Sequence, residues 1–151
     1  MSGSRTSAVA EAYPFRRVIM WGEAALAVAG VAGAVQLVTG VATPPAERLP
    51  FGLTTWRLPG AWLFATVAVP SGAAAALAWR RSPRTPSAVL VGSGLLATEL
   101  VTQVPFVGPN PLQAVFGAVA VGLGGVGLLA GRAGWGRAWS VTPAGSSASP
   151  A

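Results

Sequence analysis

Glu99 is the residue of this sequence whose type and setting best suit chemistry, because it is an acid between two apolar stretches. The residues before it include VLVGSGLLA, and those after it, beyond a short polar segment, include AVFGAVAVGL. An ionisable side chain within a membrane costs about 2.5–3.5 kcal/mol or more, so such residues usually face a bundle interior and often relay protons. Glu99 therefore predicts either a polar contact between helices or a site that exchanges protons.

Three amides are predicted to lie near this acid. Gln103 follows Glu99 by one helical turn, which is close enough for a hydrogen bond. Gln36 and Gln113 belong to neighbouring apolar segments and fall at a similar depth. Amides between membrane helices commonly form hydrogen bonds that contribute about 0.6 kcal/mol each and have no further role. We therefore expect the three amides to join helices, whereas Glu99 stays open to either interpretation.

Two further residues offer Glu99 a partner. Pro70 has no backbone N–H, and its ring displaces the carbonyl four residues earlier, on Thr66. A protonated Glu99 could donate a hydrogen bond to that carbonyl. Arg57 is the alternative partner for an ionised Glu99, since a long arginine side chain can reach inward from the end of its segment.

Glu23 lies near the start of the first apolar segment, shortly after Arg16 and Arg17. The dipole of a helix favours an acid near its N-terminal end. A long side chain at this depth can also reach the membrane surface. The sequence therefore predicts that Glu23 is an anchor, which reaches the membrane surface or pairs with one of these two arginines, rather than a functional site.

Small residues mark the faces on which the helices are expected to pack. Gly92 lies two turns before Glu99, on the same helix face. Ala118 and Gly122 repeat at four-residue spacing in the last apolar segment. Small residues at this spacing let membrane helices approach closely, either within one bundle or between two chains.

The elements that must position these residues follow from composition. Of 151 residues, 52% are hydrophobic and 9% are charged, whereas a soluble domain carries about 25% charged residues. The apolar residues form long blocks, as a bilayer requires. The blocks predict an all-α integral membrane four-helix bundle, with spans at about 18–40, 60–79, 87–107 and 111–131. Residues 1–17 and 132–151 are predicted to be tails, the second mostly disordered because it is rich in Gly, Ser and Pro.

The arginines predict the orientation of the chain. All ten basic residues are Arg, and those on one side of the predicted spans are Arg5, Arg16, Arg17, Arg80, Arg81, Arg84, Arg132 and Arg137. Only Arg48 and Arg57 lie on the other side. Because positive residues favour the cytoplasmic side, we expect both termini in the cytoplasm and a multi-pass protein of the plasma membrane. This arrangement also explains the net charge of +6 without a nucleic-acid partner.

Missing residue types limit the chemistry. The chain has no Cys and no His, which excludes disulfides, thiolate chemistry and Ser–His–Asp triads and argues against ordinary zinc sites. The run GLGGVG follows no predicted strand, so it is not a nucleotide-binding loop. We therefore expect no cofactor, no metal site and no enzymatic activity.

The segment from Leu49 to Gly131 resembles a group of uncharacterised four-span integral membrane proteins of actinobacteria. The resemblance rests on LPFG before the second predicted helix, LPGAWLF at its start, the acid Glu99, and VPFVGPNPLQAVFG. It implies a four-span membrane fold and no particular activity. Glu23 is similar in position to the first-helix glutamate of small multidrug-resistance transporters, but the motifs around that glutamate and the very short loops of those proteins are missing here.

Two hypotheses about function follow. In the first, the protein is a non-enzymatic accessory or interaction component of the bacterial envelope, surrounded by the lipid bilayer and partnered by another membrane protein or a second copy. In the second, it is a small proton-coupled transporter or carrier that uses Glu99. A water path to Glu99 would favour the carrier, whereas a dry and fully hydrogen-bonded Glu99 would favour the accessory protein.

Overall fold

The computed structural model describes residues 13–41, 43–49 and 52–136 of the chain, and these ranges contain helices and turns but no strand. The helical elements are α2 (Arg16–Thr39), η1 (Ala46–Arg48), α3 (Arg57–Leu63), η3 (Phe64–Ala68), α4 (Val69–Trp79), α5 (Thr85–Val107) and α6 (Pro111–Arg132). Because α3, η3 and α4 run on without a break, the described residues hold four helices long and apolar enough to cross a membrane. The predicted all-α fold with four membrane-length helices is confirmed.

Three of the helices begin earlier than the apolar blocks predict. The first begins at Arg16 rather than at 18, the second at Arg57 rather than at 60, and the third at Thr85 rather than at 87. Polar side chains at a membrane surface can face water while their backbone stays helical, so a helix extends beyond its apolar block. Of the two predicted tails, residues 1–12 and 137–151 lie outside the described residues.

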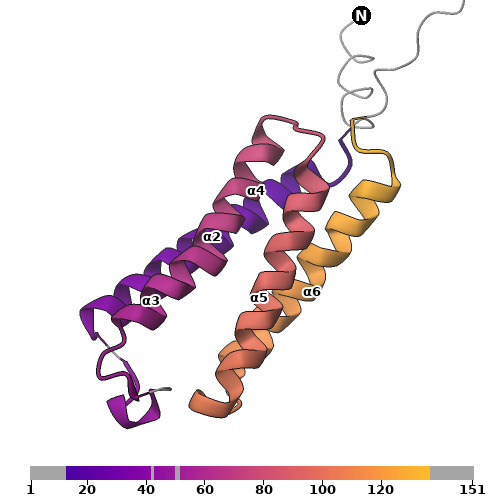
Figure 1. Ribbon diagram of the computed structural model, residues 1–151. Coiled ribbons are helices and arrows are strands. Elements are labelled where there is room, and N and C mark those ends of the chain that lie inside the picture. Colours follow the sequence, from indigo (N-terminus) through magenta and orange to yellow (C-terminus); the bar gives the residue numbers. More distant parts are fainter. Residues whose placement is uncertain (1–12, 42, 50–51, 137–151) are drawn as a thin grey trace, which may run out of the picture.

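The helices form two antiparallel hairpins that lie side by side (Figure 1). One hairpin pairs α2 with α3 and α4, the other pairs α5 with α6, and contacts between α4 and α5 join them. We call the end where α2 begins and α6 ends the arginine-rich end; it carries Arg16, Arg17, Arg80, Arg81, Arg84 and Arg132. The hairpins meet at this end and diverge toward the other (Figure 1).

Close approach of the helices depends on glycine. A Cβ on Gly30 of α2 would lie 3.0 Å from the backbone nitrogen of Ala68, and one on Gly127 of α6 would lie 3.0 Å from Cγ1 of Val89. Small residues at such points let helix backbones come together in a membrane. The buried side chains of the core are Ile19, Leu26, Val67, Ala74, Ala78, Val89, Leu96, Ala120, Leu123, Ala130 and Trp135.

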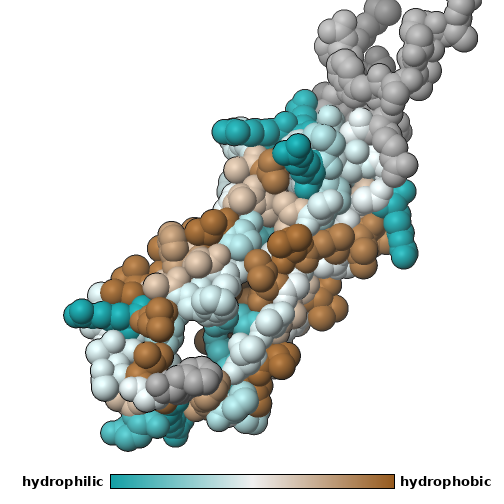
Figure 2. All heavy atoms as spheres, viewed as in Figure 1, coloured by the Kyte–Doolittle hydropathy of each residue, from teal (hydrophilic) through white to brown (hydrophobic). Residues whose placement is uncertain are grey.

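Much of the outer surface is apolar. Val121 is 78% exposed, Val101 is 71% exposed and Val28 is 70% exposed. In Figure 2, hydrophobic side chains cover mainly the middle of the elongated body, and hydrophilic ones gather mainly at its two ends. A surrounding bilayer accounts for this distribution, since its core accepts apolar side chains and its surfaces accept polar ones.

Side-chain contacts fasten the arginine-rich end. The rings of Tyr13 and Trp135 meet edge to face with centroids 5.4 Å apart. The Trp135 indole N–H donates to the carbonyl of Ser82 at 2.8 Å, and Nε of Arg16 donates to the carbonyl of Ala78 at 3.1 Å. These contacts join the start of α2, the turn between α4 and α5, and the end of α6.

The second helix changes its hydrogen-bonding pattern just before Pro70. Phe64–Ala68 form the π-turn η3, and regular α-helix resumes at Val69. In an uninterrupted α-helix the ring of Pro70 would clash with the carbonyl of Thr66. A π-turn is wider than an α-turn and provides room at that point. The disturbance that Pro70 predicts is therefore taken up by η3.

Candidate functional site

Glu99 of α5 is 8% exposed, and both of its carboxylate oxygens accept a hydrogen bond. The side-chain amide of Gln103, one turn further along α5, donates to Oε1 at 2.8 Å. The indole N–H of Trp62, on α3, donates to Oε2 at 2.8 Å. Protein donors therefore already hold both oxygens of this acid. We call Trp62, Glu99 and Gln103 the clamp.

The bond from Trp62 crosses between the two hairpins. It joins α3 and α5, which make little other contact, in the part of the molecule where the hairpins diverge (Figure 1). The sequence prediction missed Trp62 because a tryptophan near the end of a span is usual in the interfacial belt. Its indole N–H was the available signal, since a tryptophan in apolar surroundings usually needs an acceptor for that group.

Three of the residues proposed as neighbours of Glu99 are placed elsewhere. No hydrogen bond or ion pair among the described residues joins Gln36, Arg57 or Thr66 to Glu99. Gln36 and Arg57 are exposed. The Thr66 hydroxyl donates to the Trp62 carbonyl at 2.9 Å, within its own helix.

The rotation of α2 explains the position of Gln36. The buried residues of α2 include Leu26, Gly30 and Ala34, which follow one another at four-residue spacing. Gln36 comes two residues after Ala34, which is about 200° around the helix. The sequence predicts that Gln36 joins helices, whereas the structure turns it outward.

Gln113 caps the start of α6 rather than binding to Glu99. Its backbone N–H donates to Oδ1 of Asn110 at 3.0 Å, and the Asn110 N–H donates to Oε1 of Gln113 at 3.1 Å. This reciprocal pair satisfies two N–H groups that a helix start leaves free. Nε2 of Gln113 is buried and has no hydrogen-bond partner among the described residues.

The small residues expected at packing faces divide into two groups. Gly92 is buried and faces Pro70, whose Cβ would lie 3.9 Å from a Cβ on this glycine. Ala118 and Gly122 are exposed, and a Cβ on Gly122 would meet nothing within 4 Å. Gly92 thus helps to join α5 to α4, whereas Ala118 and Gly122 do not pack within this chain.

Glu23 is not the surface anchor that the sequence predicts, because it is 1% exposed. Among the described residues neither of its carboxylate oxygens has a hydrogen-bond partner. Arg16 donates to the end of α4 instead, and Arg17 is exposed. The cause is again the rotation of the helix, since Ile19, Glu23 and Leu26 share one face at three- and four-residue spacing and all three are buried.

Two serines accompany Glu23 in the interior. Ser71 of α4 is 1% exposed and lies beside the Glu23 carboxyl. Ser93 of α5 is 8% exposed, and its hydroxyl has no hydrogen-bond partner among the described residues. By the helical rise, the three residues lie at a similar depth, about 10–12 Å from the arginine-rich end. Three helices thus contribute a buried polar layer that the sequence analysis did not predict.

A groove of about 450 Å³ runs between α5 and α6 and is open on one side. Small residues from both helices line it: Gly94, Ala97, Gly117 and Ala120. Ser93 and Gln113 also line it, and each has a buried polar atom without a partner among the described residues. The groove therefore has walls of small residues, with two unpartnered polar atoms buried beside it.

The described residues contain no group of three or more His, Cys, Asp or Glu that could hold a metal ion. The side-chain chemistry that they do offer within the membrane-length helices consists of carboxyl, amide, hydroxyl and indole groups that exchange hydrogen bonds. The absence of a cofactor and of enzymatic activity stays a prediction from the sequence.

Comparison with protein-family models, with curated proteins and with solved structures gives no match to this chain. The four membrane-length helices agree with the four-span part of the resemblance noted above. The link to actinobacterial proteins rests on the quoted sequence motifs alone.

Proposed function

We propose that this protein is a non-enzymatic, multi-pass protein of the bacterial plasma membrane that acts as an accessory component by binding another membrane-spanning helix. The groove between α5 and α6 carries this proposal. Membrane helices associate where small residues let backbones approach and where polar side chains hydrogen-bond across the interface. The groove offers the first through Gly94 and Gly117 on its walls, and Ser93 and Gln113 beside it have buried, unpartnered polar atoms that a rotation of the side chain would bring to a bound helix.

The clamp also supports an accessory role for the protein. Both oxygens of Glu99 are held by Trp62 and Gln103, so this acid has a structural task and is not free for a ligand. The distribution of arginines supports the plasma membrane and cytoplasmic termini, as argued from the sequence.

The test uses the absence of cysteine from the natural chain. A single cysteine replaces Val121, which lines the groove, and a matched control replaces Val28 on α2; both valines are largely exposed. In native membranes each cysteine is labelled with a membrane-permeant benzophenone maleimide, which on irradiation cross-links to nearby C–H bonds, because the chain has no lysine for an amine-directed reagent. We expect a discrete adduct from Val121→Cys and none from Val28→Cys. The mass of the adduct tells a second copy from a different protein, and equal cross-linking of both variants would contradict the proposal.

A proton-coupled carrier is the second candidate, and Glu23 rather than Glu99 favours it. Glu23 is buried in a membrane-length helix with no hydrogen bond to either oxygen among the described residues. Ionisable residues in such positions commonly take part in proton relays. Glu23→Gln keeps the shape of the side chain and removes the titratable proton of the carboxyl group.

Vesicles with an imposed pH gradient and an internal pH dye test this candidate. If the protein is a carrier, the parent dissipates the gradient in the presence of a transported cation, Glu23→Gln does not, and Glu47→Gln behaves like the parent, because Glu47 is exposed outside the long helices. If the parent and Glu23→Gln dissipate the pH gradient at equal rates, Glu23 takes no part in proton-coupled transport.

A further inference from the structure

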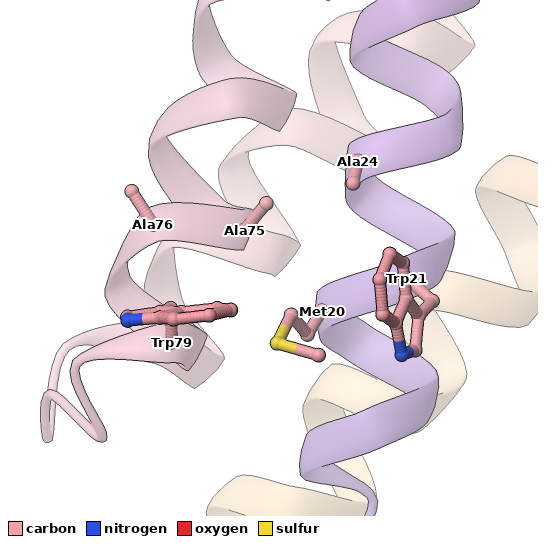
Figure 3. Close-up of a pocket in the computed structure, with 6 residues that line it drawn as sticks. All are labelled: Met20, Trp21, Ala24, Ala75, Ala76 and Trp79. Carbon is pink, nitrogen blue, oxygen red and sulfur yellow. The ribbon is translucent and has the colours of Figure 1, made fainter.

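A notch of about 250 Å³ lies between α2 and α4, close to the arginine-rich end (Figure 3). It is lined by Met20, Trp21, Ala24, Ala75, Ala76 and Trp79. In Figure 3 the ring of Trp79 extends from α4 toward Met20, and the ring of Trp21 stands on α2. The three alanines are too small to fill the space between these larger side chains. The result is an apolar recess with an indole on each wall.

The two indoles contact little of the protein. Trp21 is 67% exposed and Trp79 is 68% exposed. Tryptophan is enriched at the level of the lipid headgroups, where its ring meets acyl chains and its N–H meets polar groups. At five residues or fewer from the helix ends at Arg16 and Trp79, both rings occupy that level. The recess therefore opens toward the outermost part of the acyl chains and the headgroups.

An arginine stands at the outer end of each wall. Arg17 precedes Trp21 by one turn on the same face of α2. Arg80 follows Ala76 by one turn, and its backbone N–H donates to the Ala76 carbonyl at 3.0 Å. Both arginines are exposed, and neither guanidinium has a hydrogen-bond or ion-pair partner among the described residues. Arg16 differs, because its guanidinium is bound to the end of α4.

We propose that this notch binds one anionic phospholipid of the bilayer, with an acyl chain between Trp21 and Trp79 and the phosphate between Arg17 and Arg80. Guanidinium groups bind phosphate oxygens with strong, charge-assisted hydrogen bonds. Arginines next to membrane helices attract anionic lipids in the same way. The apolar lining suits an acyl chain, which a free phosphate ion lacks. A zwitterionic lipid fits the same recess, but its own ammonium group competes with the arginines for the phosphate.

Brominated lipids test this assignment, because bromine quenches the fluorescence of tryptophan in contact with it. The full chain is reconstituted at low salt in phosphatidylcholine vesicles that contain a few mole per cent of either dibromo-phosphatidylglycerol or dibromo-phosphatidylcholine. We expect phosphatidylglycerol to quench more at equal mole fraction. The apparent preference should be roughly five-fold for each arginine that contributes.

Three variants locate the effect. Arg17→Gln/Arg80→Gln should abolish the preference for phosphatidylglycerol. Arg84→Gln/Arg132→Gln removes the same charge from the same end, away from the walls of the notch. This variant should retain the preference for phosphatidylglycerol. Ala75→Leu fills the recess without changing charge and should lower quenching by both lipids. Helix content and elution volume confirm that each variant is folded.

Equal quenching of the parent by the two lipids would overturn the proposal. A preference that falls equally in both double-arginine variants would also overturn it, because the attraction would then belong to the whole charged end and not to the notch. An unchanged response of Ala75→Leu to both lipids would show that no acyl chain occupies the recess.

Discussion

Glu99 and Glu23 are both acids within membrane-length helices, and their surroundings are opposite. Glu99 accepts hydrogen bonds from Trp62 and Gln103 at both oxygens. Glu23 is more deeply buried and accepts none among the described residues. A buried polar group without a partner is destabilising by about 1–3 kcal/mol, whereas a satisfied one can join helices. The two residues should therefore respond oppositely to replacement.

The clamp predicts coupling between Trp62 and Glu99. In a double-mutant cycle of Trp62→Phe and Glu99→Leu, we expect a coupling free energy of about 0.6 kcal/mol, and up to about 1.7 kcal/mol, because each change removes the same interhelical hydrogen bond. Unfolding in mixed detergent micelles measures it. Trp21→Phe paired with Glu99→Leu is the control and should be additive, because Trp21 is exposed on the surface of α2. Additive effects of Trp62→Phe and the Glu99 change would argue against the clamp.

Replacing Glu23 by an apolar residue of similar size should stabilise the protein. We expect Glu23→Leu to raise the free energy of unfolding by about 1–3 kcal/mol, since it removes a buried group without a partner. The matched change Glu99→Leu should lower it, because the donors on Trp62 and Gln103 would lose their acceptor. A loss of stability in Glu23→Leu would show that the Ser71 hydroxyl, which lies beside the carboxyl, acts as its partner.

At the scale of the elements, the helices could be predicted and their rotations could not. Length and hydropathy identify a span, because a bilayer requires about 20 consecutive apolar residues. The orientation of Gln36 and Glu23 depends on which face each neighbouring helix covers, and nearly every face of a membrane helix is apolar. The pair formed by Glu99 and Gln103 was predictable, since both residues lie on one helix a turn apart. Trp62 was not, because its contact depends on how α3 and α5 cross.

The π-turn predicts an unusual tolerance to deletion. A π-turn contains one residue more than an α-turn. In a Pro70→Ala background, where no proline ring needs the extra room, deleting Ala65, which is exposed within η3, should convert it to an α-turn and keep Trp62 and Ser71 on their present faces. Deleting Ala73, which is exposed in regular α4, should rotate Trp62 by about 100° relative to Ala78 and break the clamp.

Unfolding in detergent compares the two deletions. Both deletions are made in the Pro70→Ala background, and we expect the Ala65 deletion to stay close to that background in stability. The Ala73 deletion should lose more than the roughly 0.6 kcal/mol of a single interhelical hydrogen bond, because it displaces a whole packing face. The reverse order of stabilities would refute this account of η3.

At the scale of the whole molecule, four membrane-length helices place both ends of the described chain on one side. The arginines near that side predict that it is cytoplasmic. A reporter fused at Arg84 should report the cytoplasm, and one fused at Asn110 should report the external side. Because these two turns follow the second and third helices, they must give opposite results if the span count is right. An external signal at Arg84 would show that the orientation is opposite to the predicted one. The same signal at both positions would show that the number of spans is not four.

The divergence of the two hairpins makes the molecule narrower at the arginine-rich end than at the other (Figure 1). A body of this shape occupies more area in one leaflet than in the opposite one. With the narrow end in the cytoplasmic leaflet, it adds area to the external leaflet and fits a membrane that bulges outward. In a thin tube drawn from a giant vesicle, molecules with the wide end outward should therefore be enriched over the flat membrane. The lateral distribution of the protein would then depend on the local shape of the membrane as well as on its composition.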